Sequence, residues 1–294
     1  MKKKKMNKKE PQKKKKLHLK LFIKLKKQMQ KIPLKVWIVI LIICVGGLSF
    51  SGYKFYSWRK DNIAAKNLME ATENNTPVEE VVEDTELVNP PENKQDMYYS
   101  FVDLPLMSVD FDELLKTNKN TKAFLKVNGT NVNYPVVQAT DNKYYLTHAF
   151  DNSKNGGGWV FLDYRNNMDN LSDNTIIYGH GRKNGTIFGS LKKIVDSSWY
   201  ENSSNYTIYI STPKENTLWQ VFSVYKIPNE TYYLISKFGS EESHQKFINI
   251  MLDRSIHNFN TQVTTKDKIL TLSTCWNHDV KVVLHAKLIK RQVR

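Results

Sequence analysis

The hydrophobic pattern begins with one long apolar run. Residues 36–53 (VWIVILIICVGGLSFSGY) carry no charged side chain, and Lys35 and Lys54 flank them. An α-helix needs about 20 apolar residues to cross a bilayer, and lysines at its ends can reach the interface. We therefore expect a transmembrane anchor over residues 36–53. A cleaved signal peptide is the alternative, but the 35-residue charged leader and the weak small-residue pattern argue against it.

Eight strand-like segments lie between residues 123 and 289, with turn residues between them. The Asn128-Gly129 pair is a strong hairpin-turn signal between the first two. Many short strands separated by turn chemistry are typical of an all-β barrel or sandwich. The segments are residues 123–127, 132–138, 159–164, 175–178, 206–211, 218–227, 268–274 and 281–289.

Two segments have helical patterns. Residues 108–116 (SVDFDELLK) predict a short helix with Ser108 as its N-cap. Residues 241–255 place Phe247, Ile248, Met251 and Leu252 at helical spacing. This second helix either covers the edge of the sheet as a lid or helps to shape a substrate groove, and both interpretations stay open at this point.

A polar, acidic segment separates the apolar run from the strands. Few large apolar residues recur in it with any period, and Pro90-Pro91 breaks any helix, so we expect a stalk or a partly helical spacer. The expected organisation is a Lys-rich cytoplasmic tail over 1–35, an anchor over 36–53, an acidic extracellular linker over 54–97 and a folded domain over 98–294.

The net charge of +15 belongs to the N-terminal tail. Of the 44 Lys+Arg and 29 Asp+Glu, 16 Lys and one Glu lie in residues 1–35, which leaves 28 of each sign in the rest. The balance after residue 35 offers no global basic field for a nucleic acid. Positive charge collects on the cytoplasmic side of membrane helices, so we expect a single-pass protein of the cell membrane with its folded domain outside.

The number and positions of the cysteines limit the kinds of site that the chain can form. The chain has two cysteines, Cys44 in the apolar run and Cys275 far downstream, which excludes a disulfide-stapled scaffold and a Cys-rich zinc site. Cys275 closes the strand-like run KILTLSTC. A residue at a strand end is well placed to be a nucleophile, but a small buried hydrophobe is an equally good interpretation from composition alone.

A catalytic thiol needs a base or a nearby positive charge. Among the seven His, His180 is favoured because it ends the strand-like run NTIIYGH between Gly179 and Gly181, where the backbone can turn sharply. We expect His244 and His257 at the surface and His285, inside a strand, in the core or on a face of the sheet. His18 lies in the tail, and His148 and His278 have no decisive context.

The segment TLSTC, residues 271–275, resembles the TLxTC signature of sortases, the transpeptidases of Gram-positive cell surfaces. NVNYPVVQATDNKYYLTHAF, GGWVFLDYRNN, NTIIYGHGRKNGTIFGSLKKI and WQVFSVYKI resemble class B sortase segments in the same order. The similarity covers about residues 108–290. It implies a mainly β fold: a closed eight-stranded barrel with a short N-terminal helix and a helix inserted before the Cys strand. It also implies Cys275 as nucleophile and His180 as its acid/base partner.

One position departs from the family pattern. Sortases carry an Arg at the start of the strand after the Cys, where it steadies substrate and oxyanion, whereas this chain has Lys281 and no Arg between Cys275 and Arg291. Lys281 can supply the charge but not the planar five-donor fork. Arg182 is a weaker substitute. Ser273 and Thr274 are expected next to the substrate, near the oxyanion donors.

The resemblance implies a membrane-anchored cysteine transpeptidase that needs no metal or cofactor. Its expected partners are secreted proteins with a Thr-containing sorting motif, often Asn-Pro-x-Thr in class B, and an amine of a peptidoglycan precursor or cross-bridge. Three alternatives stay open: a pilin-polymerising sortase, a hydrolytic cysteine protease, and a weakly catalytic surface-binding module in which Lys281 does not replace the Arg.

Overall fold

A computed structural model describes residues 24, 33–75, 78–81, 84–275 and 279–294. The chain forms two compact units, Met1–Arg59 and Lys60–Arg294, and we call the second the barrel unit. Helix α2 (Leu34–Asn75) contains the whole apolar run. In the described part of the chain it is the one helix long and apolar enough to cross a membrane, and protein covers none of its most apolar window. A buried core helix is therefore excluded for this segment.

The barrel unit is mainly β, as expected. Its strands are β1 (Val78–Val81), β2 (Glu86–Leu87), β3 (Leu106–Val109), β4 (Thr121–Val127), β5 (Asn133–Val137), β6 (Phe161–Leu162), β7 (Asn174–Tyr178), β8 (Thr207–Ser211), β9 (Glu215–Pro228), β10 (Ile269–Cys275) and β11 (Val280–Val293). Its helices besides the end of α2 are α3 (Asp112–Thr117), α4 (Ser197–Tyr200) and α5 (Glu241–Arg254), with 3-10 turns at Met97–Ser100, Tyr144–Leu146, Ser190–Val195 and Ser203–Tyr206.

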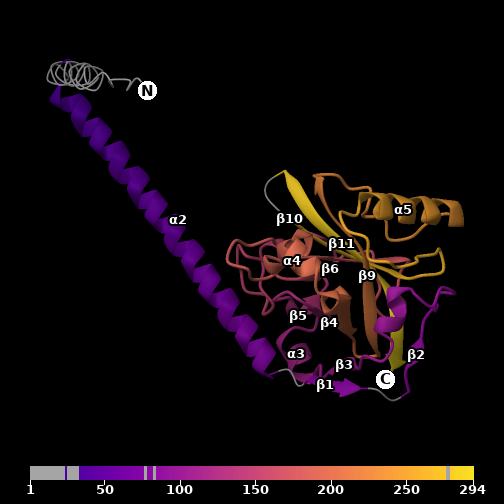
Figure 1. The fold of residues 1–294 in the computed structure, drawn as a ribbon. Helices are drawn as coiled ribbons and strands as arrows, with labels where there is room; N and C mark the ends of the chain where they lie inside the picture. The colour runs from indigo at the N-terminus through magenta and orange to yellow at the C-terminus, as the bar shows by residue number, and fades with distance from the viewer. Residues whose placement is uncertain (1–23, 25–32, 76–77, 82–83, 276–278) are drawn as a thin grey trace, which may run out of the picture. The chain divides into compact units, whose positions relative to one another are not determined.

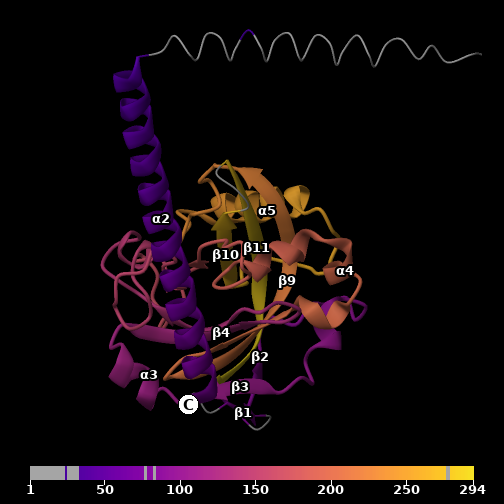
Figure 2. The same cartoon turned by 90° about the vertical axis from the view of Figure 1, so that its left-hand side faces the viewer.

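Eight strands close into a barrel. The sheet order is β10-β7-β6-β5-β4-β8-β9-β11, and β10 also pairs with β11, which joins the two ends of the sheet. Strand β10 runs parallel to β7 and antiparallel to β11. Strand β2 adds to the edge of β11, and β1 pairs with β3. Helix α5 lies toward the end of the barrel at which β10 finishes, and α3, β1 and β3 lie toward the other (Figures 1 and 2).

All eight predicted strands are confirmed, β4 to β11. Short strand-like runs separated by turn residues predict them. In β4, Lys122 and Lys126 are exposed between buried neighbours, whereas most of β9 and β11 is buried. The predicted hairpin turn is also confirmed, since β4 and β5 pair antiparallel around Gly129, whose φ of 71° suits glycine.

The start of the first predicted helix is wrong. Ser108 is buried in β3, paired with Glu79 of β1, and it caps nothing. The helix begins at Asp112, and Asp110 Oδ1 accepts a hydrogen bond from its N–H at 2.9 Å. The capping chemistry was therefore present in the sequence but two residues further along, because the preceding residues extend to pair with β1.

Helix α5 packs on the outside of the barrel. Ser240 and Ser243 form a capping box at its N-terminus, and its buried face meets β9 and β11 in an apolar cluster that includes Phe222, Phe247 and Val283. Ser223 Oγ also donates to the carbonyl oxygen of Met251 at 2.6 Å. The helix thus covers the outside of β9 and β11, and β11 is the strand that follows Cys275.

Two histidines differ from expectation. His244, expected at the surface, is buried and stacks on Phe238 with ring centroids 4.1 Å apart, and burial lowers its pKa. His257 is half-buried and stacks on Tyr200, and burial lowers its pKa as well. His244 lies in the first turns of α5, where Phe238 of the preceding segment covers its ring, and His257 follows the helix, where Tyr200 of α4 covers its ring.

His285 lies in the core, one of the two positions expected for it. Its ring sits between Tyr225 OH, 2.8 Å from Nε2, and Thr271 Oγ1, 2.9 Å from Nδ1, and Thr271 in turn donates to Asn174 Oδ1 at 2.6 Å. The side chain is fully buried, and burial lowers its pKa to about 3. This buried network ties together β7, β9, β10 and β11, the four strands around the Cys275 position.

We predict that the stability cost of His285→Gln depends on pH. Native His285 stays neutral down to about pH 3, whereas an unfolded histidine takes up a proton near pH 6.5, so wild-type stability falls as pH drops through that window. Gln does not titrate. The variant should lose about 1–3 kcal/mol at pH 7, and this gap should narrow toward pH 4. Urea unfolding of the full chain in detergent at pH 7, 5.5 and 4 measures it. A gap that stays constant with pH contradicts the buried neutral state.

Candidate active site

Two neighbouring parallel strands end side by side at one end of the barrel. Ser273 of β10 is in register with Tyr178 of β7. The contact continues past the strands, since Thr274 Oγ1 donates to the carbonyl oxygen of Gly179 at 2.8 Å. Cys275 and His180 each follow the registered pair by two residues. The two predicted catalytic residues therefore stand at the adjoining ends of two hydrogen-bonded strands.

Lys281 is placed by the pairing of β11 with β10. The antiparallel register of β10 and β11 sets Lys281 directly opposite Cys275, and Val282 opposite Thr274. The Lys281 side chain is half-buried. The structure thus brings the backbone positions of the predicted nucleophile, acid/base and cation together at one end of the barrel.

The hydroxyls of Ser273 and Thr274 are engaged inside the protein. Both residues are buried, and Ser273 Oγ lies 2.9 Å from Tyr233 OH in the segment after β9. The Thr274 hydroxyl bonds the Gly179 carbonyl, as described above. In this structure the two side chains fasten the end of β10 to its surroundings.

His180 is half-buried and held by the loop that precedes β6. Its Nε2 lies 2.9 Å from the carbonyl oxygen of Leu146. A carbonyl oxygen only accepts, so this contact assigns the proton of the neutral ring to Nε2 and leaves Nδ1 as the nitrogen that can take up or release a proton. The backbone oxygen of His180 accepts from Arg182 N–H at 2.9 Å and from Phe188 N–H at 3.1 Å.

Gly158 has no side chain, and this leaves room for the imidazole of His180. Its φ of 58° lies in the left-handed region, and a Cβ there would stand 2.4 Å from the Tyr145 carbonyl oxygen and 2.9 Å from His180 Cδ2. Only glycine allows the backbone to pass so close to the ring. Sequence reasoning missed this role, although the run of three glycines at 156–158 marks a close backbone approach.

A buried carboxylate fixes β7 just before His180. Asp163 accepts hydrogen bonds from Tyr178 OH, from Arg165 Nε and Nη2, each at 2.8 Å, and from Asn142 Nδ2 at 2.9 Å. Burial works against the charge of Asp163, but these hydrogen bonds outweigh it and hold its pKa below the usual value. Sequence reasoning missed this cluster, whose signal is an acidic residue directly after the β6 segment with Arg two residues later.

Arg182, considered above as a substitute cation, forms a hydrogen bond with helix α2. Its Nη2 donates to Asn62 Oδ1 of helix α2, within the barrel unit. Burial lowers its pKa, and the nearby Asp61 opposes that effect. His278 lies outside the described residues. Within the residues that are described, no three His, Cys, Asp or Glu side chains gather closely enough to hold a metal ion.

Comparison with known proteins gives a consistent result. Residues 125–289 match the Sortase domain family. The chain is 35% identical to Sortase B of Staphylococcus aureus over 184 residues, which cover 61% of this chain and 75% of that protein. It is 34% identical to Sortase B of Listeria monocytogenes over 163 residues, or 55% of this chain and 65% of that protein.

Solved structures extend the match to the fold. A Staphylococcus aureus sortase B–substrate complex aligns with a TM-score of 0.58 at 35% identity, over 61% of this chain and 84% of that one. Sortase B from Bacillus anthracis in complex with AAEK1 aligns with a TM-score of 0.62 at 31% identity, over 80% and 99%. The matched region holds the closed barrel and the adjoining ends of β7 and β10. This chain therefore belongs to the sortase family and is a class B sortase, a cysteine transpeptidase.

Proposed function

We propose that this sortase is anchored in the cell membrane by α2 and joins secreted proteins to an amine of the cell wall outside the cell. In this proposal Cys275 is the nucleophile, His180 the general acid and base, and Lys281 the cation that steadies the oxyanion. The substrate is an extended peptide with a Thr at the cleavage point, and the acceptor is an amine of a peptidoglycan precursor or cross-bridge.

The observation that carries the proposal is the register of β7, β10 and β11. It puts the Cys275 backbone opposite Lys281 and beside the end of the strand that leads to His180. A thiol near its ordinary pKa is a poor nucleophile at neutral pH unless a base or a cation stands close. The bond from His180 Nε2 to Leu146 leaves Nδ1 as the proton-transferring atom for such a pair.

The reaction proceeds in two acyl transfers. His180 Nδ1 first takes the thiol proton of Cys275. The resulting thiolate attacks the Thr carbonyl carbon, and the oxyanion of the tetrahedral intermediate forms. The C–N bond then breaks, the proton on His180 Nδ1 passes to the departing amine, and a thioester remains. The acceptor amine attacks that thioester, His180 Nδ1 takes its proton, and the thiolate leaves and accepts that proton from Nδ1. Each bond broken is matched by one formed, and the enzyme returns to its starting state.

Membrane anchoring is supported by the apolar surface of α2 and by the 16 lysines that precede it. A helix of this length with no protein covering its apolar window suits a lipid environment. The lysines favour a cytoplasmic N-terminus and an extracellular barrel unit. Both peptide and acceptor would then meet the enzyme at the outer face of the membrane.

The first prediction is a thioester on Cys275. The full chain in detergent, mixed with Asn-Pro-x-Thr and Leu-Pro-x-Thr peptides, should gain the mass of the acyl fragment with at least one of them. An added amine should remove the adduct and yield the ligated peptide. Intact mass spectrometry measures both steps, and Cys275→Ala is the control that should stay unmodified.

The same assay separates the alternatives. A wild-type adduct that is lost to water at the same rate with and without an amine would contradict transpeptidation and favour a hydrolytic protease. No adduct with any peptide from a folded chain would favour the surface-binding module. A Lys side chain on a pilin-like peptide acting as a better acceptor than a cell-wall amine would indicate pilin polymerisation.

The second prediction concerns Lys281. Removal of an oxyanion donor typically costs about 10²–10³ in kcat. We expect Lys281→Ala to lower kcat for ligation by about that factor, and Lys281→Arg to retain or raise the wild-type rate because the guanidinium adds donors. Lys246→Ala, on the exposed face of α5, is the matched control and should leave the rate unchanged. A wild-type kcat in Lys281→Ala would rule out the proposed role of Lys281. It would leave the proposed role of Cys275 unchanged.

A further inference from the structure

The end of helix α2 packs on the barrel unit through a single face. Going along the helix from Lys60, the residues that are buried or half-buried recur at intervals of three or four, while those between them are exposed. This spacing is that of one side of an α-helix. The covered positions are Asp61, Asn62, Ala65, Leu68, Met69 and Thr72.

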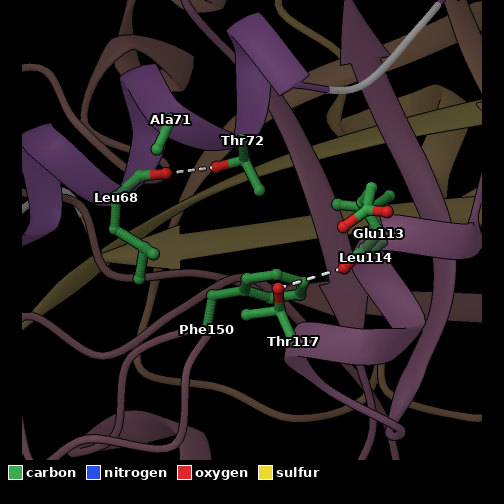
Figure 3. A pocket seen from close by; sticks show the side chains of 7 residues that line it. All are labelled: Leu68, Ala71, Thr72, Glu113, Leu114, Thr117 and Phe150. Carbon is green, nitrogen blue, oxygen red and sulfur yellow. Dashed lines mark hydrogen bonds between the residues drawn. The ribbon is translucent and has the colours of Figure 1, made fainter.

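The lower part of this face borders a pocket and packs against the apolar core. Figure 3 shows Leu68 and Thr72 of α2 lining this pocket together with Leu114 and Thr117 of α3, and the Leu68 side chain points toward Phe150. Leu68 and Met69 join the main apolar core. These are the apolar contacts of the helix face with the core. The polar pair at the start of the face, Asp61 and Asn62, has other partners.

Asp61 bonds the loop that carries the Leu146 carbonyl. Its Oδ2 accepts from the Gly156 N–H at 3.1 Å, and its backbone oxygen accepts from Asn155 Nδ2 at 3.1 Å. Asn155 N–H in turn donates to the Thr147 carbonyl at 2.8 Å, next to Leu146. Two residues after Gly156 comes Gly158, whose backbone touches the His180 ring. Asp61 therefore holds the loop whose Leu146 carbonyl and Gly158 backbone both lie against the imidazole.

Asn62 bonds the segment on the other side of His180. Its Oδ1 accepts from Arg182 Nη2 and from Asn184 Nδ2, the latter at 3.0 Å. The Arg182 N–H is itself bonded to the backbone oxygen of His180. Two consecutive helix residues thus hold both chain segments that place the imidazole, one before β6 and one after β7.

A third link runs through the middle of the same helix face. Met69 Sδ lies 2.7 Å from Tyr134 OH, and that hydroxyl accepts from the Ile187 N–H at 2.9 Å. Ile187 is paired with Gly181, the residue after His180, in an isolated β-bridge. The turn that begins at His180 is therefore linked to α2 on both sides, through Arg182 and through Ile187.

The polar contact is costly for stability. Within the described part of the chain, Arg182 Nη1 and Asn62 Nδ2 are both buried without a hydrogen-bond partner. An unsatisfied buried donor typically costs about 1–3 kcal/mol. An apolar pair at these positions would attach the helix at lower cost, so attachment alone does not explain the polar residues. Polar networks that lower stability are characteristic of functional sites.

We propose that Asp61 and Asn62 are positioning residues of the transpeptidase, which hold the two loops that orient His180 for proton transfer. The inference rests on the proposed catalytic role of His180. Neither residue reaches the substrate in this proposal, and both act through the backbone around the imidazole.

The test compares Asn62→Ala with a matched control on the same helix. Asn67 is the same residue type on an exposed position five residues later, so Asn67→Ala removes an asparagine from α2 without touching a loop. Displacement of a catalytic group by about 1 Å can cost 10²-fold in rate. We expect Asn62→Ala in the full chain to lower kcat by about 10- to 100-fold with KM within twofold. Asn67→Ala should match wild type.

A conservative variant separates positioning from simple stability. Asn62→Asp keeps the oxygen that accepts from Arg182 and Asn184, so it should restore kcat to within a few-fold of wild type. Thermal unfolding of each variant accompanies the kinetics. The proposal is overturned if Asn62→Ala retains wild-type kcat, or if kcat falls only in proportion to the folded fraction and Asn62→Asp does not restore it.

A readout without turnover distinguishes this proposal from the proposed function. The imidazole C–H resonances of His180, assigned with His180→Ala, report its surroundings in a chain that forms no adduct. Asn62→Ala should shift them and Asn67→Ala should not. Shifted resonances together with an inactive wild type would mean that positioning holds while the proposed reaction fails. Unshifted resonances in an active enzyme would reject the positioning role alone.

Discussion

The insertion of β10 between β7 and β11 is the constraint on which the rest of the structure depends. These pairings close the barrel, and the same hydrogen bonds set Cys275 opposite Lys281 and beside the end of the strand that leads to His180. A slip of β10 by one residue would turn its apolar face outward and would also break the site, because strand side chains alternate with a period of two. The stability of the fold and the geometry of the site therefore depend on the same pairing register of β10.

Buried polar groups stabilise that register around β10 and near the end of β7. His285 and its partners lie beneath the middle of β10, and Asp163 anchors β7 close to its end. Each of these groups is costly to bury and is satisfied by specific partners, which a slipped pairing would lose. The barrel thus uses hydrogen bonds to choose one arrangement of strands, while apolar packing supplies most of the free energy of folding.

Much of this arrangement could be predicted from local patterns. The strands could be placed from short runs rich in β-branched, aromatic and other apolar residues with turn residues between them, and Cys275 and His180 could be placed at strand ends because turn residues follow them. The cap at Ser108 was wrong because pairing with β1 overrode the local helix signal. His244 was misplaced because its burial depends on how the segment before α5 folds back and stacks Phe238 on the ring, which helical periodicity does not show. The roles of Gly158 and Asn62 depend on contacts between segments far apart in sequence, for which no local periodicity exists.

The central claim is that the strand register couples the Cys275 thiol to the His180 imidazole. The rate of Cys275 alkylation by iodoacetamide, measured in the full chain from pH 5 to 10 with and without His180→Ala, tests it most directly. The account predicts that the two pH profiles differ in midpoint, since a thiol beside an imidazole titrates as part of a pair. Superimposable profiles from folded proteins would contradict the account, because they would mean that the two groups do not interact.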